Sequence, residues 1–206
     1  MTTAVGNLFV IAAPSGAGKT SLVRALVDAD PLLQLSISHT TRAPRPGEID
    51  GEHYHFTDVP SFERLIASER LLEHALVHGN HYGTGRDQVE MAFAQGRDVI
   101  LEIDWQGARQ IRQRFPDCVT IFILPPSRDS LYERLQKRGQ DSAEVIARRI
   151  ANARGEIEHA TEFDYLIVND RFDAAFADLA AIVRAVRLSM RIQGPRQAGL
   201  LQQLLG

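Results

Sequence analysis

Residues 13–20, Ala-Pro-Ser-Gly-Ala-Gly-Lys-Thr, constrain the fold of this chain more than any other segment. They follow the apolar run Leu8–Ala12 and precede Ser21–Ala29, whose apolar side chains have helical spacing. A glycine-rich loop between a strand and a helix can wrap backbone N–H groups around a phosphate, and the helix dipole adds positive potential there. In such a loop Lys19 can reach the terminal phosphates, and the Thr20 hydroxyl can ligate Mg²⁺. The segment therefore predicts a phosphate loop.

The phosphate loop departs at one position from the GxxxxGK[ST] pattern, because Ala13 stands where the first glycine belongs. Alanine lacks only the freedom of positive φ and the closest backbone approach, so we expect a tolerated variant. A glycine-rich turn without a ligand would explain Gly16 and Gly18 but not Lys19-Thr20 at this spacing. The residues predicted to bind the nucleotide here are Ala13, Pro14, Ser15, Gly16, Ala17, Gly18, Lys19, Thr20 and Ser21.

Composition and charge narrow the classes of function. The chain has 206 residues, 44% of them hydrophobic, as in an ordinary globular protein. A net charge of −3 argues against a protein that binds nucleic acid or anionic membranes in general. The single cysteine, Cys118, excludes an intramolecular disulfide and favours a reducing compartment. No long apolar stretch or signal-peptide pattern occurs, so we expect a cytoplasmic protein with no membrane partner.

Alternation of apolar runs and helical patterns predicts an α/β fold. Continuous apolar runs are typical of parallel strands that are covered on both faces. The runs are Leu8–Ala12, Leu35–Ile37, Val99–Ile103, Val119–Leu124 and Tyr165–Val168. The helical patterns between or after them are Ser21–Ala29, Gln106–Phe115 and Asp173–Met190. We therefore expect a P-loop NTPase core, with a parallel sheet flanked by helices.

Two segments interrupt this alternation and predict insertions into the core. Residues 39–97 indicate a small mixed α+β lobe, and the arginine-rich residues 127–160 indicate a helical lid. The expected core then comprises residues 1–38, 98–126 and 161–206. In the lobe we expect a strand at His53–Phe56, a helix at Ser61–Ala67 and a hairpin turning at Gly79-Asn80. Residues 193–206 fit either a short docking helix or a frayed tail.

A second candidate anion site lies in the polar segment of residues 36–56. Arg42 and Arg45 are three residues apart, and Pro44 and Pro46 stiffen the chain around them. Guanidinium groups bind phosphate oxygens in a bidentate way, and the Tyr54 hydroxyl can donate to the same group. The alternative is a solvated loop with incidental arginines. A phosphate loop elsewhere in the chain favours the anion site, because an acceptor phosphate must meet the γ-phosphate.

The same segment resembles the nucleotide-monophosphate-binding signature of guanylate kinases. It reads Ser-Ile-Ser-His-Thr-Thr-Arg-Ala-Pro-Arg-Pro-Gly-Glu, then Gly and Tyr-His-Phe. The resemblance runs from the first strand to about residue 190 and includes residues 79–84, 101–107, 125–127 and 167–170. It implies phosphoryl transfer from ATP to GMP, with dGMP as a further acceptor and Mg²⁺ as the cofactor.

The resemblance also implies a role for each matched residue. The groups at the transferred phosphoryl are Lys19, Arg134, Arg138 and Arg149. Those at GMP are Ser38, Arg42, Arg45, Tyr54, Glu73, Tyr82, Thr84 and Asp104. Asn169 and Asp170 lie beside the ATP adenine, and Thr20 binds Mg²⁺, which Glu102 can assist through water. Glu73 suits guanine, because a carboxylate can accept from both N1–H and N2–H₂, a donor pair that adenine lacks.

Each of these roles has a plainer alternative. Without the resemblance, the three lid arginines would be a solvated helix face with surface ion pairs. Asp170 would be a helix N-cap, and Glu73 an exposed strand residue. At the level of function, one rival is a non-catalytic binding module of the guanylate-kinase-like kind, which binds phosphopeptides. The other is a kinase for AMP, UMP or a sugar-linked phosphate.

Overall fold

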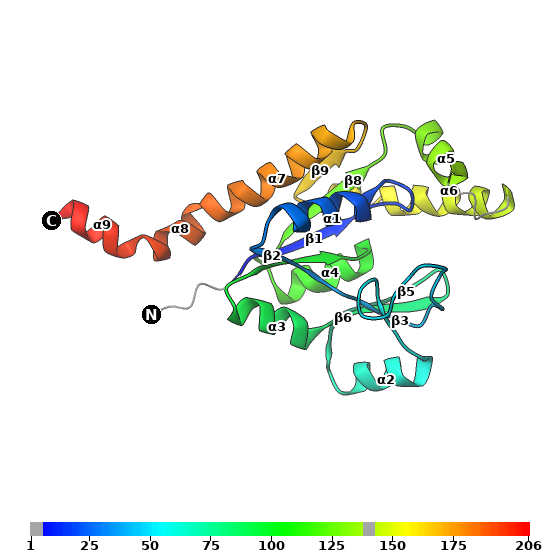
Figure 1. Ribbon diagram of the computed structural model, residues 1–206, viewed down its shortest axis with the longest axis horizontal. Coiled ribbons are helices and arrows are strands. Elements are labelled where there is room, and N and C mark those ends of the chain that lie inside the picture. Colours follow the sequence, from blue (N-terminus) through cyan, green and yellow to red (C-terminus); the bar gives the residue numbers. More distant parts are fainter. Residues whose placement is uncertain (1–5, 138–142) are drawn as a thin grey trace.

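The computed structural model describes residues 6–137 and 143–206. Its central sheet has five parallel strands in the order β2-β7-β1-β8-β9 (Figure 1). The strands are β1 (Leu8–Ala12), β2 (Leu33–Ser36), β7 (Asp98–Glu102), β8 (Val119–Leu124) and β9 (Tyr165–Val168). Val10 of β1 pairs with Leu101 on one side and Thr120 on the other. The expected parallel sheet is confirmed, and β1 lies at its centre.

Helices cover both faces of this sheet (Figure 1). They are α1 (Lys19–Ala29) and α7 (Phe172–Leu188) on one face, and α3 (Arg86–Ala94) and α4 (Trp105–Arg114) on the other. Successive residues of β1 point to opposite faces of the sheet. Phe9 and Ile11 pack with α1 and α7, and Leu8 and Val10 pack with α3 and α4. Because side chains of a strand alternate between faces, a strand covered on both sides must be apolar throughout.

A second, four-stranded sheet has the order β4-β3-β6-β5. Its strands are β3 (His39–Thr40), β4 (His55–Phe56), β5 (Leu71–Val77) and β6 (Asn80–Gly85). Helix α2 (Val59–Ala67) follows β4, and the Asp58 carboxylate caps it by accepting from the Ser61 N–H at 2.7 Å. The β5–β6 hairpin turns at His78 and Gly79, with φ of 50° and 80°. The predicted turn was therefore one residue late, because His78 takes the left-handed conformation.

Helices α5 (Arg128–Lys137) and α6 (Ala143–Ile157) form a separate small cluster beside the central sheet. Leu131 and Leu135 of α5 pack on Ile146 and Ala153 of α6. After the short 3₁₀ helix η1 (Ala160–Glu162), the chain enters β9. The ring of Trp105 at the start of α4 stacks on that of His159, just beyond α6, with 3.6 Å between centroids.

The C-terminal residues are helical but extend away from the rest of the molecule (Figure 1). They form α8 (Met190–Arg196) and α9 (Ala198–Leu205), and no residue of either helix is buried. The segment is therefore neither frayed nor buried against the core. Within residues 6–137 and 143–206, no helix combines the length and apolar character that a membrane crossing requires.

Four of the five strands of the central sheet, β1, β7, β8 and β9, agree with the sequence predictions to within one residue, but helix α3 and strand β3 were missed. Helix α3 buries only Val89 and Ala92, so its apolar periodicity is weak. Strand β3 has two residues, too few for a periodic pattern. Strand β2 begins at Leu33, two residues before the predicted run.

An ion-pair network joins α7 to the start of β7 and to the end of α1. The Arg187 guanidinium donates to Asp98 at 2.6 Å and to Asp30 at 2.5 Å. Removing Arg187 would leave the buried Asp98 carboxylate without its counterion. We expect Arg187→Ala to lower the free energy of unfolding by about 2–3 kcal/mol, measured by urea denaturation. Arg184→Ala, on an exposed position of the same helix, should change it by less than about 0.5 kcal/mol. Equal effects would contradict this account.

Candidate active site

The phosphate loop joins the end of β1 to the start of α1, as its sequence predicted. Gly16 and Gly18 have φ of 94° and 90°, in the left-handed region that favours glycine. A Cβ atom on Gly18 would lie 2.4 Å from Nδ2 of Asn169, so this glycine is also required by space. Ala13 has no such constraint, because Glu69 and His78 are the only non-glycine residues with positive φ in the described part of the chain. Alanine therefore fits the first position without backbone strain.

The end of β7 lies against the phosphate loop. Nζ of Lys19 donates to the carbonyl oxygen of Ile103 at 3.1 Å, and the Thr20 hydroxyl donates to the Glu102 carboxylate. Strands β1 and β7 are parallel neighbours, so the segments that follow them meet at the same edge of the sheet. A hydroxyl and a carboxylate side by side are the hard oxygen donors that suit Mg²⁺.

Two further elements hold the loop from the other side. Nδ2 of Asn169, which follows β9, donates to the carbonyl oxygen of Ala17 at 2.8 Å. Arg134 of α5 donates to the same oxygen at 3.3 Å and to the carbonyl oxygen of Asn169 at 2.8 Å. Next to them is a pocket of about 360 Å³, which Asp170 and Phe172 also line. Asp170 is not the N-cap of α7, because Arg171 occupies that position.

Glu73 on β5 is a buried carboxyl, with 3% of the residue exposed. The Thr84 hydroxyl on β6 donates to its Oε1 at 2.7 Å. A Cβ atom on Gly107 would lie 2.5 Å from its Oε2, so only glycine leaves room for the carboxyl there. Burial raises the pKa of Glu73 to about 7, the Thr84 hydrogen bond opposes the shift, and the charge of Asp104 adds to it. The exposed strand residue considered from sequence alone is therefore excluded.

Arg42 is brought together with Tyr54 and Tyr82. Its guanidinium lies 5.3 Å from the centroid of the Tyr54 ring, which in turn meets the Tyr82 ring edge-on at 5.9 Å. Burial raises the pKa of Tyr54 to about 12, and the negative charge of Glu102 contributes to the shift. The influence of Glu102 thus extends from the phosphate loop to the arginine and tyrosine cluster.

Comparison with known proteins gives a family for this arrangement. The sequence model of the guanylate kinase family matches residues 5–186. The chain belongs to the guanylate kinase family. The guanylate kinase of Alkalilimnicola ehrlichii is 58% identical over 98% of this chain and 99% of its own. That of Bordetella pertussis is 56% identical over 99% of this chain and 95% of its own. The crystal structure of guanylate kinase from Anaplasma phagocytophilum has a TM-score of 0.74 and 34% identity, with 90% and 88% of the two chains covered.

Not every predicted site residue of this guanylate kinase family member lies in these clusters. The Arg45 residue is exposed, and its backbone N–H donates to Glu48, the carboxylate that also pairs with Arg42 at 2.8 Å. Asp104 caps α4 by accepting from the N–H of Gly107 at 2.9 Å. The remaining predicted residues are placed as follows: Ser38 is buried just before β3, Arg149 lies on α6, and Arg138 falls outside the described residues.

Sequence reasoning missed Glu156, which lies near the end of α6. Its Oε2 accepts from the backbone N–H of Ser15 in the phosphate loop at 3.2 Å. The available signal was its spacing: Glu156 is seven residues, or about two helical turns, after Arg149 and shares that face of α6. Glu48 was missed for a different reason, because its pairing with Arg42 depends on a loop conformation that no periodicity encodes.

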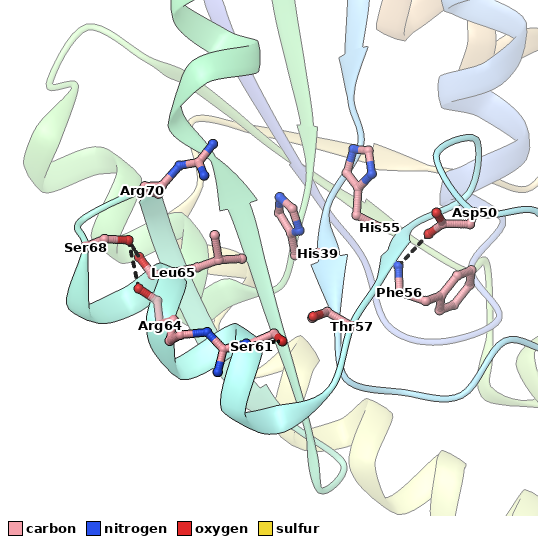
Figure 2. A pocket seen from close by; sticks show the side chains of 10 residues that line it. All are labelled: His39, Asp50, His55, Phe56, Thr57, Ser61, Arg64, Leu65, Ser68 and Arg70. Atoms are coloured by element: carbon pink, nitrogen blue, oxygen red, sulfur yellow. Dashed lines mark hydrogen bonds between the residues drawn. The ribbon is translucent and has the colours of Figure 1, made fainter.

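A second pocket, of about 510 Å³, opens between α2 and strands β3 and β4 (Figure 2). The side chains of His39 and His55 and the guanidinium groups of Arg64 and Arg70 surround it. None of its lining residues is a predicted site residue. In residues 6–137 and 143–206, no three His, Cys, Asp or Glu side chains are grouped to hold a metal ion.

The raised pKa of Glu73 predicts a pH-dependent stability. Between about pH 4.5 and pH 7 the folded state binds more protons at this group than the unfolded state, so stability falls as pH rises. Glu73→Gln removes the titration. We expect the unfolding free energy of the variant, minus that of the parent protein, to rise by about 2–3 kcal/mol from pH 5 to pH 8. Urea denaturation at both values measures this, with the exposed Glu63→Gln as control. A gain that is independent of pH would contradict the prediction.

Proposed function

We propose that this chain transfers the γ-phosphoryl group of ATP to GMP, and also to dGMP, giving ADP and a guanosine diphosphate. One observation carries the proposal: two adjacent residues that directly follow β7 interact with the two candidate sites. Ile103 accepts from Lys19 of the phosphate loop, and the charge of Asp104 acts on Glu73. The names of the related guanylate kinases support the same activity.

The chemistry assigned to the protein is charge neutralisation and alignment. The phosphate of GMP, with a second pKa of about 6, is largely deprotonated at neutral pH and needs no general base. The barrier comes from bringing two polyanions into line. We assign Lys19, Arg134 and Arg149 to the ATP side and Arg42, Arg45 and Tyr54 to the phosphate of GMP. The same family match assigns Arg138.

Mg²⁺ would be held by the Thr20 hydroxyl, with Glu102 acting through water. The ion, when bound, supplies positive charge to the phosphate oxygens of ATP. Asn169 and Asp170 are assigned to the adenine, in the pocket of about 360 Å³ that they line.

Glu73 would select guanine, together with Ser38, Thr84 and Asp104, whereas Tyr82 would contact the phosphate of GMP. An ionised Glu73 accepts from both N1–H and N2–H₂, and the bound guanine compensates the cost of burying its charge. AMP offers no such donor pair and would leave the carboxylate unpaired. The discrimination between GMP and AMP therefore depends on the same burial that raises the pKa of Glu73.

We divide the chain into a core of residues 1–38, 98–126 and 161–206, a GMP-binding lobe of residues 39–97 and a lid of residues 127–160. Closure of the lobe and lid over the core would exclude water that would otherwise hydrolyse ATP. The buried Cys118, whose pKa burial raises to about 11, suits a thiol kept reduced in the cytoplasm.

ADP release with a panel of monophosphates tests the reaction. We expect release with GMP and dGMP and little with AMP or UMP. Lys19→Ala should fold but lose at least about 100-fold in kcat, because it removes the positive charge that would stabilise the transferred phosphoryl group. Release with AMP but not GMP would favour another nucleotide kinase. No release with any acceptor would favour the binding module.

A second experiment tests the base-reading role. We expect Glu73→Gln to raise the KM for GMP at least about tenfold and to change the KM for ATP little, because only one acceptor oxygen remains for the guanine. Steady-state kinetics with each substrate varied in turn measures the KM for GMP and the KM for ATP separately. Glu63→Gln, exposed on α2, removes the same charge from the same lobe and should leave both values unchanged. An equal rise for the two substrates would remove Glu73 from this role.

A further inference from the structure

Glu156 places a negative charge against the loop that is proposed to bind phosphate. Its side chain is 18% exposed, and one carboxylate oxygen accepts from the Ser15 N–H at 3.2 Å. The backbone N–H groups of such a loop form a cradle for an anion. The carboxylate of α6 therefore engages a donor at the place where the phosphates of ATP are expected.

The other carboxylate oxygen faces the β5–β6 hairpin. Oε1 of Glu156 lies 3.8 Å from Nε2 of His78, in the turn of that hairpin. Nδ1 of His78 lies 3.1 Å from Nδ2 of Asn152, one turn earlier on α6. If the amide donates to Nδ1, the ring proton is on Nε2 and points toward Glu156. Glu156 is thus the point where α6, the hairpin and the phosphate loop meet.

The groups around the Glu156 carboxylate have opposing effects on its charge. Burial raises the pKa of Glu156, whereas the Ser15 N–H and the positive charge of Lys19 lower it, and Asp104 raises it again. The carboxylate depends on the same loop donor and the same lysine that a phosphate group would need. Two anions cannot share this region without repulsion.

We propose that Glu156 is an internal competitor of ATP, which occupies the phosphate loop in the ligand-free protein and is displaced by the nucleotide phosphates. The proposal rests on the function proposed above, because it takes ATP as the ligand of the loop. Displacement releases α6 from Ser15. Because Arg149 shares the face of α6 with Glu156, the same movement repositions Arg149. Glu156 is then a positioning residue that couples the arrival of ATP to the placement of the lid arginine.

The test is ATP binding without GMP, by isothermal titration calorimetry. Glu156→Gln keeps the shape and an acceptor oxygen for Ser15 but removes the charge. We expect it to bind ATP about fivefold more tightly than the parent protein. A merely structural role predicts the opposite sign, because a loosened loop binds less well. Melting curves of the ligand-free variant check that it is folded.

The matched control is Glu158→Gln, which removes the same charge two residues away. Glu158 is largely exposed and pairs with Arg154 at 3.6 Å, away from the loop. We expect no tightening for this variant. Equal tightening in both variants would mean a general effect of net charge, and unchanged or weaker binding in Glu156→Gln would mean that the carboxylate does not compete. Either result would overturn the proposal.

GMP phosphorylation by the parent protein separates this test from that of the function. If the parent phosphorylates GMP but Glu156→Gln shows no tightening, the competitor role fails and the proposed function stands. If Glu156→Gln binds ATP more tightly but the parent phosphorylates no monophosphate, the acceptor assignment fails and the competitor role stands.

Discussion

The parallel pairing of β1 with β7 is the constraint on which the site depends. It places the phosphate loop, which follows β1, beside Glu102, the last residue of β7, and beside Ile103 and Asp104, which follow it. Strand β1 and the interior of β7 are apolar, because helices cover the two faces of the sheet. Hydrophobic burial therefore fixes the register of the two strands, and the register brings the polar groups at their ends together. No contact between the polar residues themselves is needed to create this proximity.

Both positively charged and acidic side chains lie around that edge of the sheet. Arg42 and Arg134 are each held by oxygen atoms of the protein, the former by Glu48 and the latter by two carbonyl groups. The carboxyl groups of Glu73 and Glu156 have raised pKa values because burial opposes their ionised forms. Two largely buried carboxyl groups thus lie on the same side of the molecule as the cations of the phosphate loop and of the arginine and tyrosine cluster.

The sequence predicted the parts of this protein that have a strong local pattern. The central strands, the phosphate loop and the order of the elements follow from apolar runs and from Gly16, Gly18, Lys19 and Thr20. What it could not predict depends on tertiary contacts: the weakly amphipathic α3, the turn at His78, and the approach of Glu156 to Ser15. The burial of Glu73 belongs to the same group, because packing against Gly107 decides it.

The stacking of Trp105 on His159 has a practical consequence. Trp105 is the single tryptophan of the chain, and its partner lies just beyond α6. Indole emission depends on ring contacts and on exposure to water. The protein therefore carries a native optical reporter beside the C-terminal end of α6, and a change in this stacking can be followed in real time without any attached dye.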